Sequence, residues 1–327
     1  MYYNQHTIIY HHGEFVKAVN ANANVYDTSL HYGYAVFEGI RSYNTRNGVK
    51  IFKAEEHFQR MEFSAKAIGI PYPYNNEDLI AISYEVLKRN NMTDAYLRPI
   101  VTCPPNMSLT GATSSQLTIA AWEWATLLGE KLVRIKTSPY RRINASSFIV
   151  EAKVSGHYVN SILASKEARD AGYDEALLLD INGFVAEGPG ANFFYEKNDV
   201  LFTPQRGSIL PGITRATVIE ICKSLDIEVV EKQMTPEEVY NADSAFYCGT
   251  AAEVIGIESL DNKKFPKNWN ETVGAVIQEA YKNLGYKNGS FSIAEEIANT
   301  CLSLPLWPGL KAEEVDLISD SIKSLLM

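Results

Sequence analysis

The sequence has few of the features that mark membrane, metal-binding or secreted proteins. A bilayer-spanning helix needs ~20 consecutive apolar residues, and no run approaches that length. The four cysteines form no CxxC pair and the six histidines form no HExxH motif, so neither a disulfide framework nor a zinc site is indicated. No basic segment precedes an apolar N-terminal core, so we expect no secretory signal and a reducing, cytoplasmic environment.

Positive charge is also scarce. Lysine and arginine number 30 against 39 aspartates and glutamates, which gives a formal net charge of −9 and a pI near 5.3. A protein of this charge repels polyanions, so the composition argues against nucleic acid or an acidic membrane surface as a partner. Small molecules and other protein chains remain as expected partners.

The overall composition is that of a folded globular protein. Hydrophobic residues make up 46% and charged residues 21% of the 327 residues. A chain of this length exceeds the roughly 100–200 residues of a typical single domain, so we expect two domains. No internal repeat or low-complexity tract is visible.

Apolar spacing and turn residues predict an α+β fold. Two hairpins open the chain, 8–10 with 14–16 around His12-Gly13, and 35–43 with 50–52 around Asn47-Gly48, a strong turn signal. Helical spacing follows over 54–68 and 79–87. The remaining expected strands are 95–102, 116–124, 133–138, 148–152, 176–179, 184–186, 193–195, 200–202 and 246–248, and the remaining helices are 158–171 and 214–225.

Lys153 is a candidate for covalent chemistry. It lies at the end of the apolar segment 148–152, which we expect to be a strand, and next to small residues. A lysine in such a position is partly desolvated, and desolvation lowers the pKa of an amine toward a useful range. The alternative is a surface lysine on a connecting loop.

Other segments could hold an anionic ligand. Glu187 opens the tight stretch Gly188-Pro189-Gly190, where the main chain can approach a planar ring closely. The segment LPGITR (210–215) precedes an apolar helical run, and free N–H groups at a helix start bind phosphate. The turn GTAAE (249–253) is similar, and Arg60 could supply a cation. The alternatives are an exposed carboxylate, a capped helix with nothing bound and a solvated arginine.

The order of these segments is more specific than any one of them. Over about residues 5 to 280 the chain resembles the branched-chain aminotransferases, which belong to the fold-type IV pyridoxal-phosphate enzymes. The segments that carry the resemblance are LHYGYAVFEGIR (30–41), HFQR (57–60), AYLRP (95–99), EAK (151–153), EGPGAN (187–192), LPGITR (210–215) and GTAAE (249–253).

The resemblance implies a two-domain fold like that of D-amino-acid aminotransferase, with the cofactor in the interdomain cleft. The domains would be an N-terminal α/β domain (1–125), an interdomain loop (126–137), a C-terminal cofactor-binding domain (138–284) and an extension (285–327). Lys153 would be the Schiff-base lysine, Glu187 would pair with the pyridine nitrogen and Tyr158 with the phenolic oxygen. The other cofactor-binding residues would be Arg60, Leu210, Ile213, Thr214 and Thr250.

The resemblance also implies a substrate site. Thr250 and Ala251 would hold the substrate carboxylate with help from Tyr96, and Arg98 would receive the side-chain carboxylate of glutamate. A permanent carboxylate partner for Arg98 is the alternative, because an unpaired buried arginine is costly. Phe37, Trp124 and, from a neighbouring subunit, Tyr32 would line the side-chain pocket. A homodimer or larger homo-oligomer follows from the role of Tyr32.

Three features depart from the family pattern. A tyrosine common after the residue matching Trp124 is absent, since the chain reads Ala125-Thr126-Leu127, and the loop 103–115 lacks a glycine-rich pattern. The tail, 291–327, resembles the C-terminal end of nucleotide-sugar aminotransferases, which have the unrelated fold type I. It is expected either to pack as an amphipathic helix or to mediate assembly.

The expected reaction is a ping-pong transamination. Leucine, isoleucine or valine would give its amino group to 2-oxoglutarate, yielding a 2-oxo acid and L-glutamate, and Lys153 would move the Cα proton. Three alternatives share the fold: a D-amino-acid aminotransferase, an aminodeoxychorismate lyase, and a catalytically silent relative that serves as a binding module.

Overall fold

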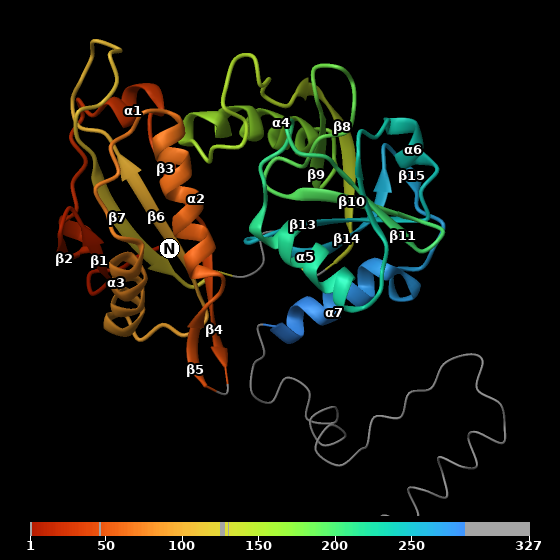
Figure 1. Cartoon of the computed structure of the whole chain (residues 1–327), viewed down its shortest axis with the longest axis horizontal. Coiled ribbons are helices and arrows are strands. Elements are labelled where there is room, and N and C mark those ends of the chain that lie inside the picture. The colour runs from red at the N-terminus through yellow and green to blue at the C-terminus, as the bar shows by residue number, and fades with distance from the viewer. Residues whose placement is uncertain (1, 46, 125–127, 130, 285–327) are drawn as a thin grey trace, which may run out of the picture. The chain divides into compact units, whose positions relative to one another are not determined.

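The computed structural model describes residues 2–45, 47–124, 128–129 and 131–284, which all belong to one compact unit, Met1–Tyr286. Two β-sheets flanked by helices make up this unit (Figure 1). The expected α+β class is therefore confirmed. None of the helices in the described ranges has the length and apolar character needed to cross a membrane. The segments 125–127 and 285–327, on which we based expectations about the pocket and the tail, lie outside the described residues.

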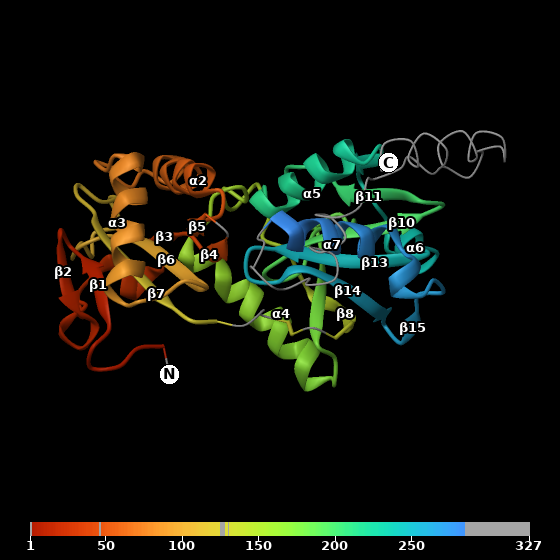
Figure 2. The same ribbon diagram turned by 90° about the horizontal axis from the view of Figure 1, so that it is seen from below.

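The N-terminal sheet has the strand order β2-β1-β7-β6-β4-β5, with β3 paired to β6. Helices α2 (Ala54–Ala67) and α3 (Asn76–Arg89) pack on it (Figure 2), because apolar residues at helical spacing, among them Phe58, Met61 and Val86, are fully buried. A short helix, α1 (Thr28–Tyr32), precedes β3. The strands are β1 (Ile8–His11), β2 (Glu14–Lys17), β3 (Val36–Phe37), β4 (Ile40–Thr45), β5 (Gly48–Ile51), β6 (Ala95–Thr102) and β7 (Gln116–Trp122).

The C-terminal sheet has the order β12-β11-β10-β13-β14-β8-β9, with β15 paired to β14. Helices α5 (Ile213–Ser224) and α7 (Val273–Leu284) share one apolar cluster with β10 and β13, whereas α4 (Tyr158–Asp170) packs against β9 on the other face (Figure 2). The strands are β8 (Val133–Arg141), β9 (Glu175–Leu179), β10 (Asn192–Lys197), β11 (Val200–Pro204), β12 (Val229–Lys232), β13 (Ser244–Gly249), β14 (Glu253–Leu260) and β15 (Lys263–Lys264), and the remaining helix is α6 (Pro236–Tyr240).

A close contact joins the segment before β3 to the segment before α4. An isolated bridge pairs Val36 with Val154, and the Ser155 N–H donates to the Ala35 carbonyl at 2.8 Å. Gly33 has a φ of +65°, and a Cβ at this position would lie 2.7 Å from the Gly156 Cα. Two glycines therefore let the main chains approach closely beside Lys153.

The segment 148–152 was predicted as a strand, and this prediction is wrong. The structure has turns there, in which the Phe148 N–H donates to the Asn144 carbonyl and the Ala152 N–H to the Ile149 carbonyl. The apolar content misled us because Val150 and Ala152 are buried in a turn, while Phe148 and Ile149 remain exposed. Lys153 therefore follows a series of turns instead of a strand.

Other elements differ less. The expected strand 176–179 corresponds to β9, but the expected strand 184–186 is absent: a turn at Asn182-Gly183 leads only to an isolated bridge between Leu179 and Val185. β7 ends at Trp122, two residues before the expected end. β8 begins at Val133, within the range that we expected to be an interdomain loop, and the division into domains at 125 and 138 stays a proposal. The sequence analysis missed α1, α6, α7, β12, β14 and β15.

Candidate active site

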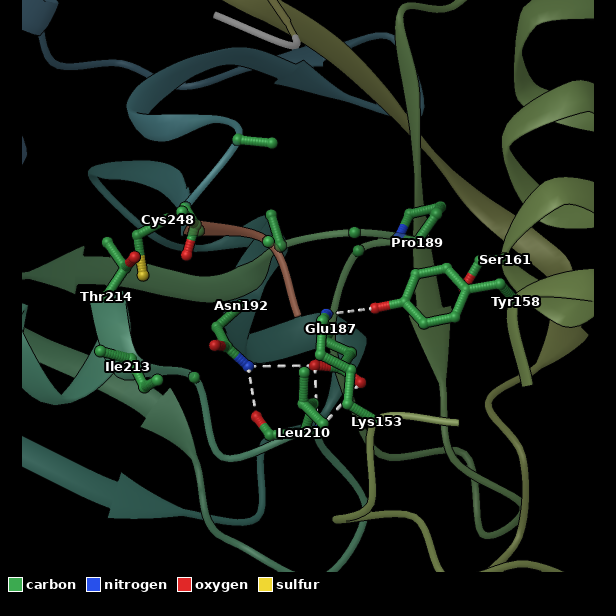
Figure 3. A pocket seen from close by; sticks show the side chains of 18 of the residues that line it. Lys153, Tyr158, Ser161, Glu187, Pro189, Asn192, Leu210, Ile213, Thr214 and Cys248 are labelled. Atoms are coloured by element: carbon green, nitrogen blue, oxygen red, sulfur yellow. Dashed lines mark hydrogen bonds between the residues drawn. The ribbon is translucent and has the colours of Figure 1, made fainter. Parts of the chain in front are cut away.

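One cavity, bordered by residues of both sheets and the segments between them, brings together the expected site residues (Figure 3). Tyr32 is the exception: it lies on α1, is 49% exposed and does not border the cavity of its own chain. The expected residues that do border it are Phe37, Arg60, Tyr96, Arg98, Trp124, Lys153, Tyr158, Glu187, Leu210, Ile213, Thr214, Thr250 and Ala251.

Lys153 is held by its main chain and faces Tyr158. Its N–H donates to the Ser64 hydroxyl at 2.9 Å, and its carbonyl accepts from the Phe37 N–H at 3.2 Å. The Lys153 Nζ lies 2.6 Å from the Tyr158 hydroxyl (Figure 3) and 4.9 Å from the centre of the Phe37 ring. The amine is thus placed by contacts that do not involve the amine itself.

Glu187 is buried and accepts hydrogen bonds from several donors. The Arg142 Nε lies 2.6 Å from one carboxylate oxygen, and the Asn192 Nδ2 lies 3.0 Å from the other (Figure 3). The Leu210 N–H donates to the same carboxylate at 3.1 Å. Charge-assisted bonds of this kind fix the carboxylate at the cavity wall and stabilise its negative charge. The Asn192 Nδ2 also donates to the Leu210 carbonyl, which ties the two segments together.

The start of α5 forms an anion-binding surface. Gly212 is the N-cap residue and makes no side-chain cap, and the N–H groups of Ile213 and Thr214 donate to no described residue. Unpaired N–H groups and the helix dipole together favour an anion at this end. A Cβ on Gly212 would lie 1.9 Å from the Asn192 Oδ1, so the chain can pass here only without a side chain.

Arg60 is oriented by a buried acidic residue. Its Nε and Nη2 donate to the two oxygens of Glu38, each at 2.8 Å, and its Nη1 donates to the Pro211 carbonyl at 3.0 Å. Burial alone would raise the pKa of Glu38, but the charge of Arg60 and the hydrogen bonds from Arg60 and His57 lower the pKa well below its usual value. The pair therefore stays charged and places the guanidinium beside the start of α5.

Arg98 is a partly buried cation of a different kind. Its Nη2 donates to the Tyr96 hydroxyl at 3.2 Å, and its guanidinium carbon lies 4.6 Å from the centre of the Phe37 ring. Its Nε is buried without a hydrogen-bond partner, and no carboxylate of the described residues forms an ion pair with it. Such a group is costly unless an anion joins it. The described residues thus give no support to the alternative that a carboxylate of the protein permanently pairs with Arg98.

Several residues of the cavity wall escaped the sequence analysis: Arg142, His157, Ser161, Asn192 and Cys248. Asn192 ends the motif EGPGAN and could have been assigned from it. Burial lowers the pKa of His157 to about 4, with the positive charge of Arg142 contributing, so this imidazole is neutral near pH 7. No local signal identified Arg142, since its partner Glu187 lies 45 residues away.

These groups fit pyridoxal 5'-phosphate. Lys153 offers an amine for an aldehyde, Glu187 a fixed carboxylate for a ring nitrogen, Tyr158 a hydroxyl, and the α5 start with Arg60 a site for phosphate. Within the described residues no group of three or more histidines, cysteines or acidic residues is placed to hold a metal ion.

Comparisons with known proteins agree with this geometry. Residues 35–260 match the family model described as amino-transferase class IV. Residues 249–323 match that of the DegT/DnrJ/EryC1/StrS aminotransferase family, in line with the resemblance of the tail to a second group of aminotransferases. A branched-chain-amino-acid aminotransferase of Pseudomonas aeruginosa is 37% identical over 283 residues, which cover 85% of this chain and 92% of that protein.

Two solved structures are also similar. The branched-chain aminotransferase of Thermoproteus uzoniensis with norvaline has a TM-score of 0.82 and 37% identity, covering 85% of this chain and 94% of that one. A branched-chain amino acid aminotransferase complexed with N-(5'-phosphopyridoxyl)-L-glutamate, from the organism abbreviated T.th., has a TM-score of 0.80 and 37% identity, covering 86% and 94%.

Proposed function

Because the chain belongs to the amino-transferase class IV family, we propose that it transfers amino groups between branched-chain L-amino acids and 2-oxoglutarate, with pyridoxal 5'-phosphate as cofactor. The donors are leucine, isoleucine and valine, and the products are their 2-oxo acids and L-glutamate. The observation that carries this proposal is Arg98, a cation without a described carboxylate partner in a pocket that Phe37 and Trp124 also line.

Pyridoxal phosphate, when bound, supplies a ring that withdraws electrons from the substrate Cα. The chain supplies the remaining parts. The Lys153 Nζ binds the cofactor and, once released, removes the proton from the substrate Cα, with Tyr158 as its hydrogen-bonding neighbour. The negative charge of Glu187 stabilises a positive charge on the ring nitrogen. The start of α5, together with Arg60, holds the phosphate.

One pocket must accept two very different side chains. Phe37, Tyr96 and Trp124 offer apolar surface to leucine, isoleucine or valine, and Tyr96 and Trp124 lie edge to face with ring centres 4.8 Å apart. Arg98 pairs with the second carboxylate of glutamate or 2-oxoglutarate when those substrates enter. The aromatic faces around Arg98 stabilise its charge while the apolar substrates are bound.

We also propose that the chain works as a homodimer in which Tyr32 borders the site of the partner subunit. Large apolar side chains are exposed near the candidate site: Phe148 49%, Ile149 44%, Val159 61% and Ile162 64%. Val159 and Ile162 lie one helical turn apart on α4. Burial of such a patch against a second copy removes apolar surface from water. Light scattering on the purified protein measures the assembly.

Amino-donor profiling with 2-oxoglutarate tests the proposed function. Wild-type protein is expected to use L-leucine, L-isoleucine and L-valine and to leave D-leucine unused, which separates it from a D-amino-acid aminotransferase. Arg98→Ala should raise KM for 2-oxoglutarate by about 10- to 100-fold, the value of a charge-assisted pair, with a much smaller change for leucine.

Arg98→Lys serves as the matched variant, because it keeps the charge and loses the planar fork. It should fall between wild type and Arg98→Ala. Equal reactivity of 2-oxoglutarate in wild type and Arg98→Ala would show that Arg98 does not receive the second carboxylate. Absence of leucine transamination in the wild type would refute the proposed function itself.

A further inference from the structure

Arg41, on β4 of the N-terminal sheet, is buried against the turn between β13 and β14. Its Nε donates to the Thr250 carbonyl at 3.0 Å, and its Nη2 donates to the Ala251 carbonyl at 3.4 Å. Its Nη1 donates to the Trp124 carbonyl at 3.1 Å. The three acceptors belong to residues that border the cavity, yet Arg41 itself does not border it.

The turn between β13 and β14 has a strained main-chain conformation, which side chains of β4 stabilise. Glu253, its last residue, has a φ of +56°, which side chains larger than glycine rarely adopt. The Tyr43 hydroxyl donates to the Glu253 Oε1 at 2.9 Å, and the Arg41 Nε lies 3.8 Å from the same oxygen. Arg41 and Tyr43 are two residues apart on one strand and therefore point to the same side. Strain of this kind persists where surrounding contacts over-determine the conformation.

Peptide geometry connects these contacts to the cavity. In a planar trans peptide the carbonyl of one residue and the N–H of the next point in opposite directions. Because Arg41 holds the Thr250 carbonyl, the Ala251 N–H points away from Arg41. That N–H donates to no described residue, and Ala251 borders the cavity. The bond to the Ala251 carbonyl fixes the following peptide in the same way.

We infer that Arg41 is a positioning residue for the substrate's α-carboxylate: it holds the turn of Thr250 and Ala251 so that the Ala251 N–H faces that group. The inference rests on the proposed function, since it concerns the same substrate. Arg41 thus belongs to the N-terminal sheet but acts on the substrate through the turn between β13 and β14. The bond to the Trp124 carbonyl sets the distance between this turn and the side-chain pocket.

An arginine is required by this arrangement. Its fork reaches three carbonyl oxygens that belong to two separate segments, whereas the single ammonium of a lysine cannot reach all three in the same geometry. Arg41→Lys keeps the buried positive charge and removes the fork. It therefore separates the loss of positioning from the loss of charge.

Ligand binding to the holoenzyme tests the inference directly. The probes are 4-methylvalerate, which is leucine without its amino group, and the uncharged 4-methylpentanamide, both titrated against the absorbance of the bound cofactor. In Arg41→Lys the affinity for the acid should fall about tenfold or more, with the amide changed less than about threefold. In turnover, KM should rise for both leucine and 2-oxoglutarate, because both carry an α-carboxylate, while kcat changes little.

This pattern differs from that of Arg98→Ala, which is expected to affect 2-oxoglutarate far more than leucine. Tyr43→Phe removes the hydroxyl that bonds Glu253 and should weaken acid binding in the same direction by a smaller factor. Arg134→Lys is the matched control: Arg134 also donates to a main-chain carbonyl, that of Gly172 at 2.8 Å, but at an exposed edge. It should leave both ligands unaffected.

Wild-type affinity for the acid in Arg41→Lys would overturn the inference, as would equal losses of acid and amide binding, which indicate a general structural role. If Arg41→Lys does not fold or does not retain cofactor, acid binding is measured on Tyr43→Phe instead. Unchanged acid binding in Tyr43→Phe would then overturn the inference. A wild-type holoenzyme that binds the acid but does not transaminate leucine would refute the proposed function, whereas the role of Arg41 would still be decided separately by acid binding in Arg41→Lys.

Discussion

The two sides of the cavity are built from different kinds of structure. The N-terminal sheet contributes Phe37 from β3 and Tyr96 and Arg98 from β6, all within paired strands. The C-terminal half contributes Lys153, Glu187 and Thr250 from segments outside its regular strands. Most residues proposed to select the substrate thus lie on strands, whereas those proposed to perform the chemistry lie in loops that bonds to their main chains or side chains hold in place.

The charged side chains on the two sides also differ in how many of their hydrogen-bonding groups have partners. Arg98 has no described carboxylate partner, while Glu187 accepts from Arg142, Asn192 and Leu210. A charge whose bonds are complete serves as a fixed wall, and a charge with an unused donor is available to a ligand that enters and leaves. The difference indicates which side of the cavity meets the variable part of the substrate.

The largest effect is expected on the C-terminal side, from Lys153→Ala. Activity should fall at least about 10³-fold, because the amine both binds the cofactor and moves a proton. The fold should persist, since the bonds from the Lys153 N–H to Ser64 and from Phe37 to the Lys153 carbonyl involve only the main chain of Lys153. Steady-state kinetics and circular dichroism measure the two quantities.

Lys166→Ala is the control, because Lys166 is an exposed lysine on α4. It should keep wild-type activity. A Lys153→Ala protein that unfolds would contradict the idea that main-chain bonds place this residue.

The next effect is expected on the N-terminal side, from Glu38→Gln. Glu38 and His57 are fully buried, and Arg60 depends on both oxygens of Glu38. Breaking a buried ion pair by neutralising one partner should lower the free energy of unfolding by about 3–5 kcal/mol. The released Arg60 should also weaken cofactor binding. Urea unfolding of the cofactor-free protein and cofactor titration measure these changes.

Glu62→Gln provides the comparison, since Glu62 is a partly exposed residue of α2 that pairs with the exposed Lys66 and also accepts a hydrogen bond from Asn76. Surface pairs contribute about 0–1 kcal/mol, so its effect should be small. Similar losses in both variants would mean that the buried pair on the N-terminal side has no special part in stability.

A smaller effect is expected from His157, a residue of the C-terminal half that borders the cavity. The pKa of His157 is lowered from 6.5 to about 4 by burial and by Arg142, so the folded state favours the neutral imidazole. Its contribution to stability is complete above pH 6.5 and is lost as the pH falls toward 4, because the unfolded chain takes up the proton first. The melting temperature of the wild type should drop more between pH 7 and 5 than that of His157→Asn.

The exposed His6 supplies a control variant, His6→Asn, which should follow the wild-type pH dependence. Parallel curves for the wild type and His157→Asn would contradict a buried, neutral His157.

The sequence predicted the strand side of the cavity better than the loop side. The alternation of β6, with a hairpin and two helices before it, follows from apolar spacing, and both ends of the expected strand 95–102 match the structure. The segment before Lys153 was misread because burial of Val150 in a turn and burial in a strand leave the same apolar pattern. Periodicity alone does not distinguish them.

Long-range polar contacts could not be predicted from local patterns. Arg41 and Thr250 are separated by 209 residues, and Arg60 and Pro211 by 151 residues. An arginine on a strand or helix is read locally as a solvated side chain, and its buried partners become visible only when distant segments meet. The family resemblance identified Arg60, because its motif is specific, but it did not reveal that Glu38 orients it.

The central claim is a covalent bond between the Lys153 Nζ and the cofactor aldehyde. Borohydride reduction of the yellow holoenzyme, followed by peptide mapping, tests it most directly. The account predicts that the reduced cofactor is found on the peptide that contains Lys153. Its recovery on a different lysine, or on no peptide at all, would contradict the account.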